Sequence, residues 1–238
     1  MTFRYVGNEL DTFSIATNWK RYFGCILRPY LCGDILEVGA GNGTTTAALF
    51  NQDVTRWVCL EPDKALGESI RSIPNVHCEV LSLVLSNYNA PDRFDTVLYI
   101  DVLEHIEKDR AELEMAYARL NDGGYLVVLA PAHQHLLSPF DASIGHYRRY
   151  STASLVGLSP HGAEVVRCIY LDSIGFFLSL ANRVLLRASA PTRKQIMFWD
   201  RGIVPMSRIT DRLLRFRFGK SVLVVWRKTV PGQSMHTV

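Results

Sequence analysis

The stretch "DILEVGAGNGTTTAAL" at residues 34–49 decides the fold of this chain. A short apolar run ends at Glu37 and Val38 and is followed at once by three glycines within five residues. Glycine has no Cβ and accepts positive φ angles, so residues 39–43 predict a tight turn where a ligand can approach bare backbone. The helix expected from Thr44 would offer that ligand unpaired N–H groups. Such a turn from strand to helix binds nucleotides at the carboxyl edge of a parallel sheet.

The acids around this turn narrow the class of ligand. The third glycine comes too early for the dinucleotide pattern G-x-G-x-x-G, and no Walker lysine follows. Glu37 stands two residues before the first glycine, where a carboxylate suits a ligand that carries an ammonium group. Glu61 ends the next apolar run, about 20 residues after the glycines, where an acid can accept both hydroxyls of a ribose. This combination fits S-adenosyl-L-methionine (SAM).

The rest of the chain alternates short apolar runs with helical segments, which predicts an α/β fold with helices on both faces of a mainly parallel sheet. We expect one domain over residues 1–238, with a helical lead-in over 1–33 and a helical insert or cap over about 172–218. The expected strands are 34–38, 56–61, 76–80, 94–100, 124–130, 163–171 and 220–228, and the expected helices between them are 44–51, 63–72 and 107–120.

Four segments carry a resemblance to a known family: "ILEVGAGNGTTT" (35–46), "LEPD" (60–63), "FDTVLYIDVLEHIEKD" (94–109) and "NDGGYLVVLAPA" (121–132). In this order and spacing they resemble class I SAM-dependent methyltransferases of the type 11 and type 23 group. The run "SPFDASIGHYRRYSTASL" (138–155) resembles a bacterial subgroup with a D…GHYRRY segment after strand 5. The resemblance implies a Rossmann-like seven-stranded sheet in the order 3-2-1-4-5-7-6, with strand 7 antiparallel. It also implies SAM as cofactor and S-adenosyl-L-homocysteine (SAH) as product.

The family's cofactor contacts transfer to matching positions of this chain. The first motif implies contacts at the methionine end of SAM, Glu61 and Pro62 match the ribose site, and Asp101 should lie beside the ammonium group. The adenine position is held by Leu81 and Ser82, where the family often has an acid or amide. Each residue also has a structural alternative, since Gly43 could only permit helix packing and Asp101 could only cap a helix. The first motif consists of Glu37, Gly39, Ala40, Gly41, Gly43 and Thr44.

The segment "DVLEHIEKD" raises the question of a metal. In a helix, Asp101, Glu104 and His105 would share one face, and two carboxylates and an imidazole can hold a divalent ion that activates an acceptor hydroxyl. The array resembles the E-x-x-E-H metal site of some O-methyltransferases, with Asp in place of the first Glu. In relatives without metal this histidine is a wall of the pocket, and we expect no metal as the first hypothesis.

The loop "APAHQHLLSPFDASIGHYRRY" (130–150) supplies the candidates for catalysis. His133 follows the fifth strand and is the first candidate for a base, with His146 second. A solvated imidazole at His133 is the alternative. For the segment H-Y-R-R-Y, the alternative is a structural clamp in which an arginine pairs with Asp141 and Tyr150 caps the next helix. The expected substrate contacts are Trp19, Tyr22, His105, Tyr147, Arg148 and Tyr150.

The distribution of charge along the chain and its cysteine content indicate which partners and which cellular compartment to expect. Residues 1–160 carry 13 Lys and Arg against 19 Asp and Glu, whereas residues 161–238 carry 13 against 4. A helical insert that mixes apolar and basic residues fits a cap over the pocket, a dimer face or a helix on an acidic membrane surface. Nucleic acid is disfavoured because basic and aromatic residues are not interleaved. Five scattered cysteines and the absence of a signal-peptide pattern predict a cytoplasmic protein.

The sequence therefore predicts a SAM-dependent methyltransferase for a small-molecule acceptor, with oxygen as the expected acceptor atom. Secondary metabolites and glycan or lipid-linked precursors are the expected acceptor classes. Two alternatives stay open: an N- or C-methyltransferase of the same fold, and a SAM-binding subunit without catalysis. We expect the small-molecule acceptor as partner, with a homodimer or a peripheral membrane contact as further options.

Overall fold

The computed structural model describes residues 5, 7, 9–181 and 191–229, and the expected insert lies partly outside this range, at 182–190. Seven strands form one sheet in the order β3-β2-β1-β4-β5-β7-β6, which confirms the expected fold class. β7 runs antiparallel to both β5 and β6, whereas the other pairs are parallel. The strands are β1 (Gly33–Val38), β2 (Val54–Leu60), β3 (Glu79–Leu81), β4 (Phe94–Ile100), β5 (Leu120–Pro131), β6 (Ala163–Leu171) and β7 (Ser221–Lys228).

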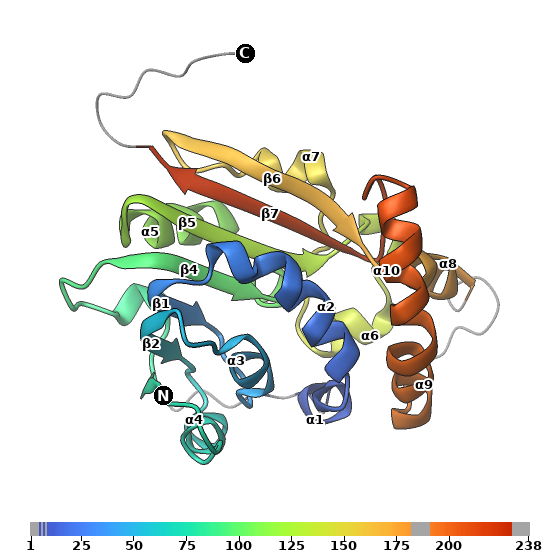
Figure 1. Cartoon of the computed structure of the whole chain (residues 1–238), viewed down its shortest axis with the longest axis horizontal. Helices are drawn as coiled ribbons and strands as arrows, with labels where there is room; N and C mark the ends of the chain where they lie inside the picture. The colour runs from blue at the N-terminus through green and yellow to red at the C-terminus, as the bar shows by residue number, and fades with distance from the viewer. Residues whose placement is uncertain (1–4, 6, 8, 182–190, 230–238) are drawn as a thin grey trace.

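Helices cover both faces of the sheet (Figure 1). The α-helices are α1 (Glu9–Ser14), α2 (Thr17–Leu27), α3 (Thr44–Leu49), α4 (Lys64–Arg71), α5 (Asp109–Ala118), α6 (Pro139–Ser143), α7 (Thr152–Val156), α8 (Ser173–Ala181), α9 (Arg193–Phe198) and α10 (Val204–Leu213). Short 3-10 turns are η1 (Arg28–Tyr30), η2 (Leu85–Asn87), η3 (Leu103–His105) and η4 (Gln134–Leu136), and a π-turn, η6 (Trp199–Ile203), joins α9 to α10.

Alternation along the central strands produces two buried cores, because successive side chains of a strand point to opposite faces. Leu36 and Val38 of β1 pack into the core shared with α5 and α7. Ile35 packs into the other core, with Trp57 and the aromatic face of α2. The sheet is thus buried on both sides, as its near-continuous apolar strands predict.

Two local expectations are wrong. The third strand begins at Glu79 instead of residue 76. No α-helix starts at Asp101: this residue has a φ of +55°, and the chain then forms only the 3-10 turn Leu103–His105. Asp101, Glu104 and His105 therefore do not share one face of a helix.

Buried acids attach the insert to the sheet domain. Asp200 accepts hydrogen bonds from the backbone N–H groups of Asn18 and Trp19, at 3.2 and 2.8 Å. Asp211 accepts one from the hydroxyl of Tyr22, at 2.8 Å. Trp19 and Tyr22, which were expected to touch substrate, are buried between α2 and the α9–α10 segment and join the two. Their contact with substrate stays a prediction.

None of the helices in the described ranges is long and apolar enough to cross a membrane.

Candidate active site

The glycine turn sits at the carboxyl end of β1, between the ends of β2 and β4. The N–H groups of Gly39 and Ala40 donate to the Leu60 carbonyl at the end of β2, at 2.8 and 3.3 Å. Gly43 has a φ of +76°, which an L side chain rarely adopts, and a Cβ there would lie 2.6 Å from the Ile73 side chain. The turn thus needs glycine for both backbone geometry and space.

The α3 helix has Gly43 as its N-cap residue, with no side-chain cap bond. Thr44 is its first residue, and the side-chain oxygen of Asn42 accepts from both the N–H and the hydroxyl of Thr44, at 3.3 and 2.9 Å. Asn42 therefore fixes the side chain and backbone of Thr44 where the helix begins, a contact that sequence reasoning missed.

Glu61 ties the glycine turn to the end of β2. Its carboxylate accepts from the N–H groups of Gly41 and Asp63, at 2.8 and 2.9 Å. The side chain is 4% exposed, and burial raises its pKa. Ribose contacts at Glu61 and Pro62 stay a prediction. Leu81 and Ser82, expected near adenine, are half-buried next to Glu61, and the Leu81 carbonyl accepts from the Glu61 N–H.

The Glu37 side chain points into the core, toward α3 and β2, and not toward the surface of the glycine turn. Its Oε2 accepts from the Thr46 hydroxyl at 2.7 Å and from the Trp57 indole at 2.9 Å. The side chain is 2% exposed, and burial raises its pKa to about 7. These bonds give Glu37 a structural role within the core, and the expected contact with an ammonium group stays a prediction.

Asp101 lies at the carboxyl end of β4, on the other side of the turn from Glu61. It is exposed, and its N–H donates to the Leu129 carbonyl at 2.8 Å. The surrounding protein desolvates the carboxylate and raises its pKa, while His146, Lys220 and Lys20 act in the opposite sense. Its φ of +55° is a strained conformation for a residue other than glycine, and such strain clusters at functional sites.

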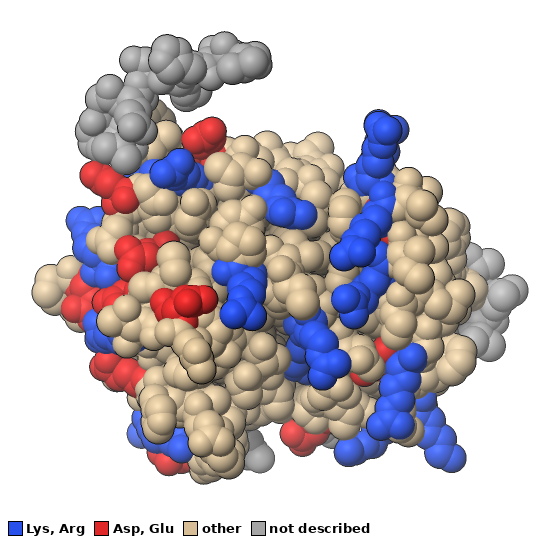
Figure 2. All heavy atoms as spheres, viewed as in Figure 1, with Lys and Arg blue, Asp and Glu red and all other residues tan. Residues whose placement is uncertain are grey.

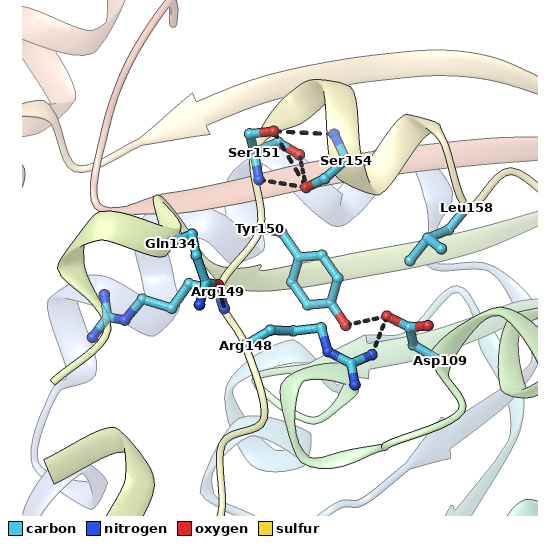
Figure 3. A pocket seen from close by; sticks show the side chains of 8 residues that line it. All are labelled: Asp109, Gln134, Arg148, Arg149, Tyr150, Ser151, Ser154 and Leu158. Carbon is cyan, nitrogen blue, oxygen red and sulfur yellow. Dashed lines mark hydrogen bonds and ion pairs between the residues drawn. The ribbon is translucent and has the colours of Figure 1, made fainter. Parts of the chain in front are cut away.

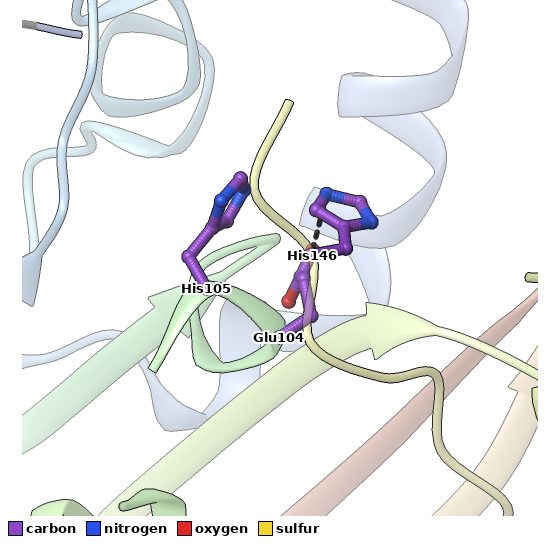
Figure 4. Close-up of side chains that lie close together, drawn as sticks. All are labelled: Glu104, His105 and His146. Atoms are coloured by element: carbon purple, nitrogen blue, oxygen red, sulfur yellow. Dashed lines mark ion pairs between the residues drawn. The ribbon is translucent and has the colours of Figure 1, made fainter. Parts of the chain in front are cut away.

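Beside Asp101, three side chains form a cluster at the start of the loop after β4. Glu104, His105 and His146 each offer a ligand atom, and these atoms lie within 4.8 Å of one another. Figure 4 shows Glu104 and His105 rising from η3 toward His146 on the loop after α6. Glu104 is fully buried, and neither of its carboxylate oxygens has a hydrogen-bond partner in the described structure. Burial and the nearby charge of Asp101 raise its pKa well above the usual value.

The two histidines of the cluster differ in their surroundings. Nδ1 of His146 lies 3.0 Å from Oδ1 of Asp141, and Nε2 lies 3.8 Å from Oε1 of Glu104. The His105 ring lies edge-on to the His146 ring, with centroids 4.5 Å apart. Burial and the neighbouring His146 lower the pKa of His105 to about 4. His105 is therefore neutral at physiological pH and fits a pocket wall or a ligand better than a base.

Asp141 holds His146 in place. It is buried, and burial alone would raise its pKa, but the His146 hydrogen bond and the Arg149 charge lower it. Arg149 lies 2.7 Å from Oδ1 of Asp141. A capping box with Ser138 also fixes Asp141 at the start of α6. The sequence placed an arginine on Asp141 but missed that Asp141 orients His146.

His133 lies at the end of β5, as expected, but its ring is engaged by the protein. Nε2 is 3.0 Å from the Gly219 carbonyl, and a carbonyl can only accept, so this nitrogen carries the proton. The ring stacks on Tyr170 at a centroid distance of 5.0 Å. Burial lowers the pKa of His133. Catalysis by His133 stays a prediction, and this placement favours His146 over it.

The segment H-Y-R-R-Y mostly forms a clamp. Tyr150 is buried, and its hydroxyl donates to Asp109 at 2.9 Å. Arg148 pairs with the same carboxylate at 2.5 Å. Figure 3 shows both side chains converging on Asp109 in a shallow cavity, while Arg149 points away. Ser151, not Tyr150, caps α7. Arg148 and Tyr150 therefore fasten the loop to α5, whereas Tyr147 is exposed. The substrate contacts expected of these three residues stay predictions.

The first described residues of the chain cover the glycine turn. The Leu10 carbonyl accepts from the Asn42 side chain at 3.2 Å. The N–H of Tyr5 donates to Asp63 at 2.8 Å, and its ring approaches His105 at a centroid distance of 6.3 Å. The described residues 5, 7 and 9–14, termed the N-terminal cover below, thus extend from the end of β2 to the cluster of Glu104, His105 and His146.

This donor set fits SAM. A carboxylate at the end of β2 suits ribose hydroxyls, and a second, exposed carboxylate at Asp101 suits an ammonium group. The bare turn between them, with positive φ at Gly39, Gly41 and Gly43, lets the sulfonium end pass close to backbone.

Comparisons with known proteins agree with this geometry. Residues 36–126 match the family model of a methyltransferase domain. No curated protein matches the chain in sequence.

Solved structures share the fold at low identity. A complex between the Haloferax volcanii Trm112 methyltransferase activator and a methyltransferase matches with a TM-score of 0.64 at 15% identity, over 96% of this chain and 100% of that one. N-methyltransferase NodS from Bradyrhizobium japonicum WM9, in complex with SAH, matches with a TM-score of 0.57 at 12% identity, over 89% and 87%. The [4+2]-cyclase SpnF matches with a TM-score of 0.60 at 14% identity, over 94% and 95%.

The cyclase among these neighbours shows that the fold by itself does not fix the reaction. The match to the methyltransferase domain, together with the donor set, narrows the reaction to methyl transfer from SAM. The chain is a SAM-dependent methyltransferase with the class I fold, with SAM as cofactor and SAH as product.

Proposed function

We propose that the chain methylates a hydroxyl oxygen of a small-molecule acceptor, with His146 as the base that removes the hydroxyl proton. One observation carries the proposal: Asp141 holds Nδ1 of His146 at 3.0 Å, which turns Nε2 toward the Glu104 carboxylate near Asp101. A hydroxyl must lose its proton during methyl transfer, whereas an amine can attack through its free lone pair. A histidine oriented by a buried carboxylate beside the donor site is therefore most useful to an oxygen acceptor.

The roles of the residues follow from their surroundings. Bound SAM supplies an electrophilic methyl group on a sulfonium. Asp101 and the glycine turn hold the donor, and alignment of acceptor and methyl in a site without water contributes most of the rate. His146 accepts the hydroxyl proton at Nε2, and Asp141 stabilises the resulting imidazolium. The N-terminal cover excludes water from the cluster.

The acceptor class rests on the expectations from sequence: secondary metabolites, glycans or lipid-linked precursors. The experiment uses SAM labelled on its methyl group, the purified full chain and an extract of the source cells, separated afterwards into organic, aqueous and macromolecular fractions. Label in the organic fraction would indicate a lipid-linked or apolar acceptor. Label in the aqueous fraction would indicate a sugar or another polar small molecule. Label in no fraction, with SAH still bound, would favour the SAM-binding subunit without catalysis.

The base is tested with His146→Gln and a matched surface control, His161→Ala, since His161 is exposed and its side chain lies away from the cluster. We expect His146→Gln to lower the rate of label transfer by about 10²- to 10⁴-fold, the usual contribution of a positioned base. SAH affinity should be unchanged, which also shows that the variant is folded. The control should keep its rate. An unchanged rate in His146→Gln would overturn the assignment and favour a nitrogen or carbon acceptor.

A second use of the same cluster is favoured by the unbonded oxygens of Glu104. Together with His105 and His146 they offer one carboxylate and two imidazoles, a set that suits transition metals. A bound divalent ion would lower the pKa of an acceptor hydroxyl. Calorimetric titration of the SAH-bound chain with Mn²⁺ or Zn²⁺ tests this. Binding that disappears in His105→Ala would support a metal, and no binding together with full activity in EDTA would remove it.

A further inference from the structure

The α9–α10 segment presents an unusual combination of side chains to solvent. Eight of the thirteen large apolar side chains that are exposed among the described residues lie between residues 177 and 214. On α10, Met206, Ile209 and Leu213 are 54%, 64% and 76% exposed. Their spacing of three and four residues places them on one side of the helix. Isolated exposed apolar residues are ordinary, but a continuous stripe marks an interaction surface.

Cations that pair with no acid surround this stripe. The exposed ones are Arg193, Lys194, Arg201, Arg212, Arg215 and Arg217, and none of them takes part in an ion pair with a described residue. The only acids between residues 191 and 218 are Asp200 and Asp211, which are 2% and 0% exposed and bonded inward to α2. Figure 2 shows basic side chains along the side that carries α9 and α10, while acidic side chains gather mostly at the opposite end.

We propose that this basic apolar face, formed by the six cations together with Phe198, Met206, Ile209 and Leu213, docks the protein on a membrane surface rich in anionic phospholipid. A helix that lies in the membrane interface has this composition, with apolar side chains among the acyl chains and Lys or Arg beside the headgroups. Cations near an anionic leaflet are attracted by its negative surface potential. Charge complementarity thus selects an acidic lipid surface.

Other occupants fit the face less well. A two-fold dimer through α10 would place the cationic face against its own copy, and like charges would oppose the contact. Nucleic acid satisfies the cations, but its interfaces are polar and would leave the stripe of Met206, Ile209 and Leu213 unused. A lipid surface accommodates both kinds of side chain.

The face also borders the donor site. α9 contacts α1, which belongs to the N-terminal cover over the glycine turn. Docking would therefore bring the membrane beside the N-terminal cover. Membrane docking by this face does not require a particular acceptor or the base His146, so its test is independent of the proposed function.

The test is flotation of the full chain with vesicles of phosphatidylcholine alone and vesicles that also contain phosphatidylglycerol. We expect binding only to the anionic vesicles. The triple variant Arg201→Glu/Arg212→Glu/Arg215→Glu removes three cations from the face. Each exposed cation contributes about fivefold to binding, so the loss of three cations alone weakens binding by about 100-fold. The three added carboxylates are repelled by the anionic surface, so we expect a loss of at least about 100-fold. SAH binding of the variant should be unchanged, which shows that it is folded.

Two further variants separate the face from general charge. The control Arg28→Glu/Lys64→Glu/Lys108→Glu makes the same change in net charge at exposed positions elsewhere and should keep most of the binding. High salt screens the attraction between the cations and the lipid headgroups, so the binding that remains at high salt comes from the apolar side chains. The variant Ile209→Ser/Leu213→Ser should lose this remaining binding to the anionic vesicles. Equal losses in the face variant and the control, or no binding to anionic vesicles, would overturn the proposal. If the chain binds a DNA duplex as tightly as it binds vesicles, the face is a nucleic-acid surface. If the chain forms a dimer through the face and does not bind vesicles, the face is a dimer interface.

Discussion

Glu37 gives the chain a pH dependence that can be measured without knowing the acceptor. Its side chain is 2% exposed, and burial raises its pKa from 4.5 to about 7, although bonds from Thr46 and Trp57 favour the charged form. The unfolded chain releases this proton near pH 4.5, whereas the folded chain keeps it to about pH 7. Between these values the folded state binds more protons, so the free energy of unfolding falls as pH rises.

The size of the effect follows from the two pKa values. Each pKa unit corresponds to about 1.4 kcal/mol, so the full difference is worth about 3 kcal/mol, most of it lost between about pH 5 and about pH 8. Glu37→Gln cannot ionise and keeps a side chain of the same shape. We expect the wild type to lose about 2 to 3 kcal/mol more than this variant over that interval.

The assay is urea unfolding at a series of pH values, with the wild type and Glu37→Gln compared at each. Other titrating groups contribute to both curves and cancel in the difference. Glu68→Gln, on the exposed side of α4, is the matched control and should follow the wild type. If the difference between wild type and Glu37→Gln does not change with pH, the carboxylate ionises as it does in water, and the structural role assigned to Glu37 is refuted.

Two further substitutions test the glycine turn and the attachment of the insert. Gly43→Ala places a Cβ 2.6 Å from Ile73 at a φ of +76°, and we expect a loss of about 1 to 3 kcal/mol in the free energy of unfolding, measured in urea, whereas an unchanged midpoint would show that the turn adapts freely. Tyr22→Phe removes the hydroxyl bonded to buried Asp211 at 2.8 Å, so we expect a loss of about 1 to 3 kcal/mol with SAH affinity preserved; a loss of SAH affinity alone would return Tyr22 to the site.

The fold was predictable because local sequence and tertiary structure agree over most of the sheet. Apolar runs such as residues 94–100 are buried strands, and the glycine turn stands where the first of them ends. The third strand begins three residues later than predicted. Glu79–Leu81 is short, and its position is fixed by pairing with β2, which no local pattern encodes.

The site was predicted less completely, for reasons of tertiary contact. A helix from Asp101 was expected from spacing, but the bond from its N–H to Leu129 of β5 holds the residue at positive φ. His146 meets Glu104 because the loop after α6 folds back over η3, where the Tyr147 N–H donates to the Glu104 carbonyl, and spacing alone does not show this. The burial of Trp19 and Tyr22 against the insert depends on Asp200 and Asp211, which lie about 180 residues later in the chain, so no local pattern could show it.

The N-terminal cover has a consequence for the timing of turnover. Polar contacts join it to three parts of the protein: the Leu10 carbonyl accepts from Asn42, the Tyr5 N–H donates to Asp63, and the Phe13 carbonyl accepts from the Lys20 ammonium at 2.8 Å. If SAM binds at the glycine turn as proposed, this segment must open before SAH can leave. We therefore expect the opening of the N-terminal cover to set the residence time of SAH, and such steps limit turnover in many enzymes. Shortening the cover would speed exchange of the donor and admit water to the cluster around His146.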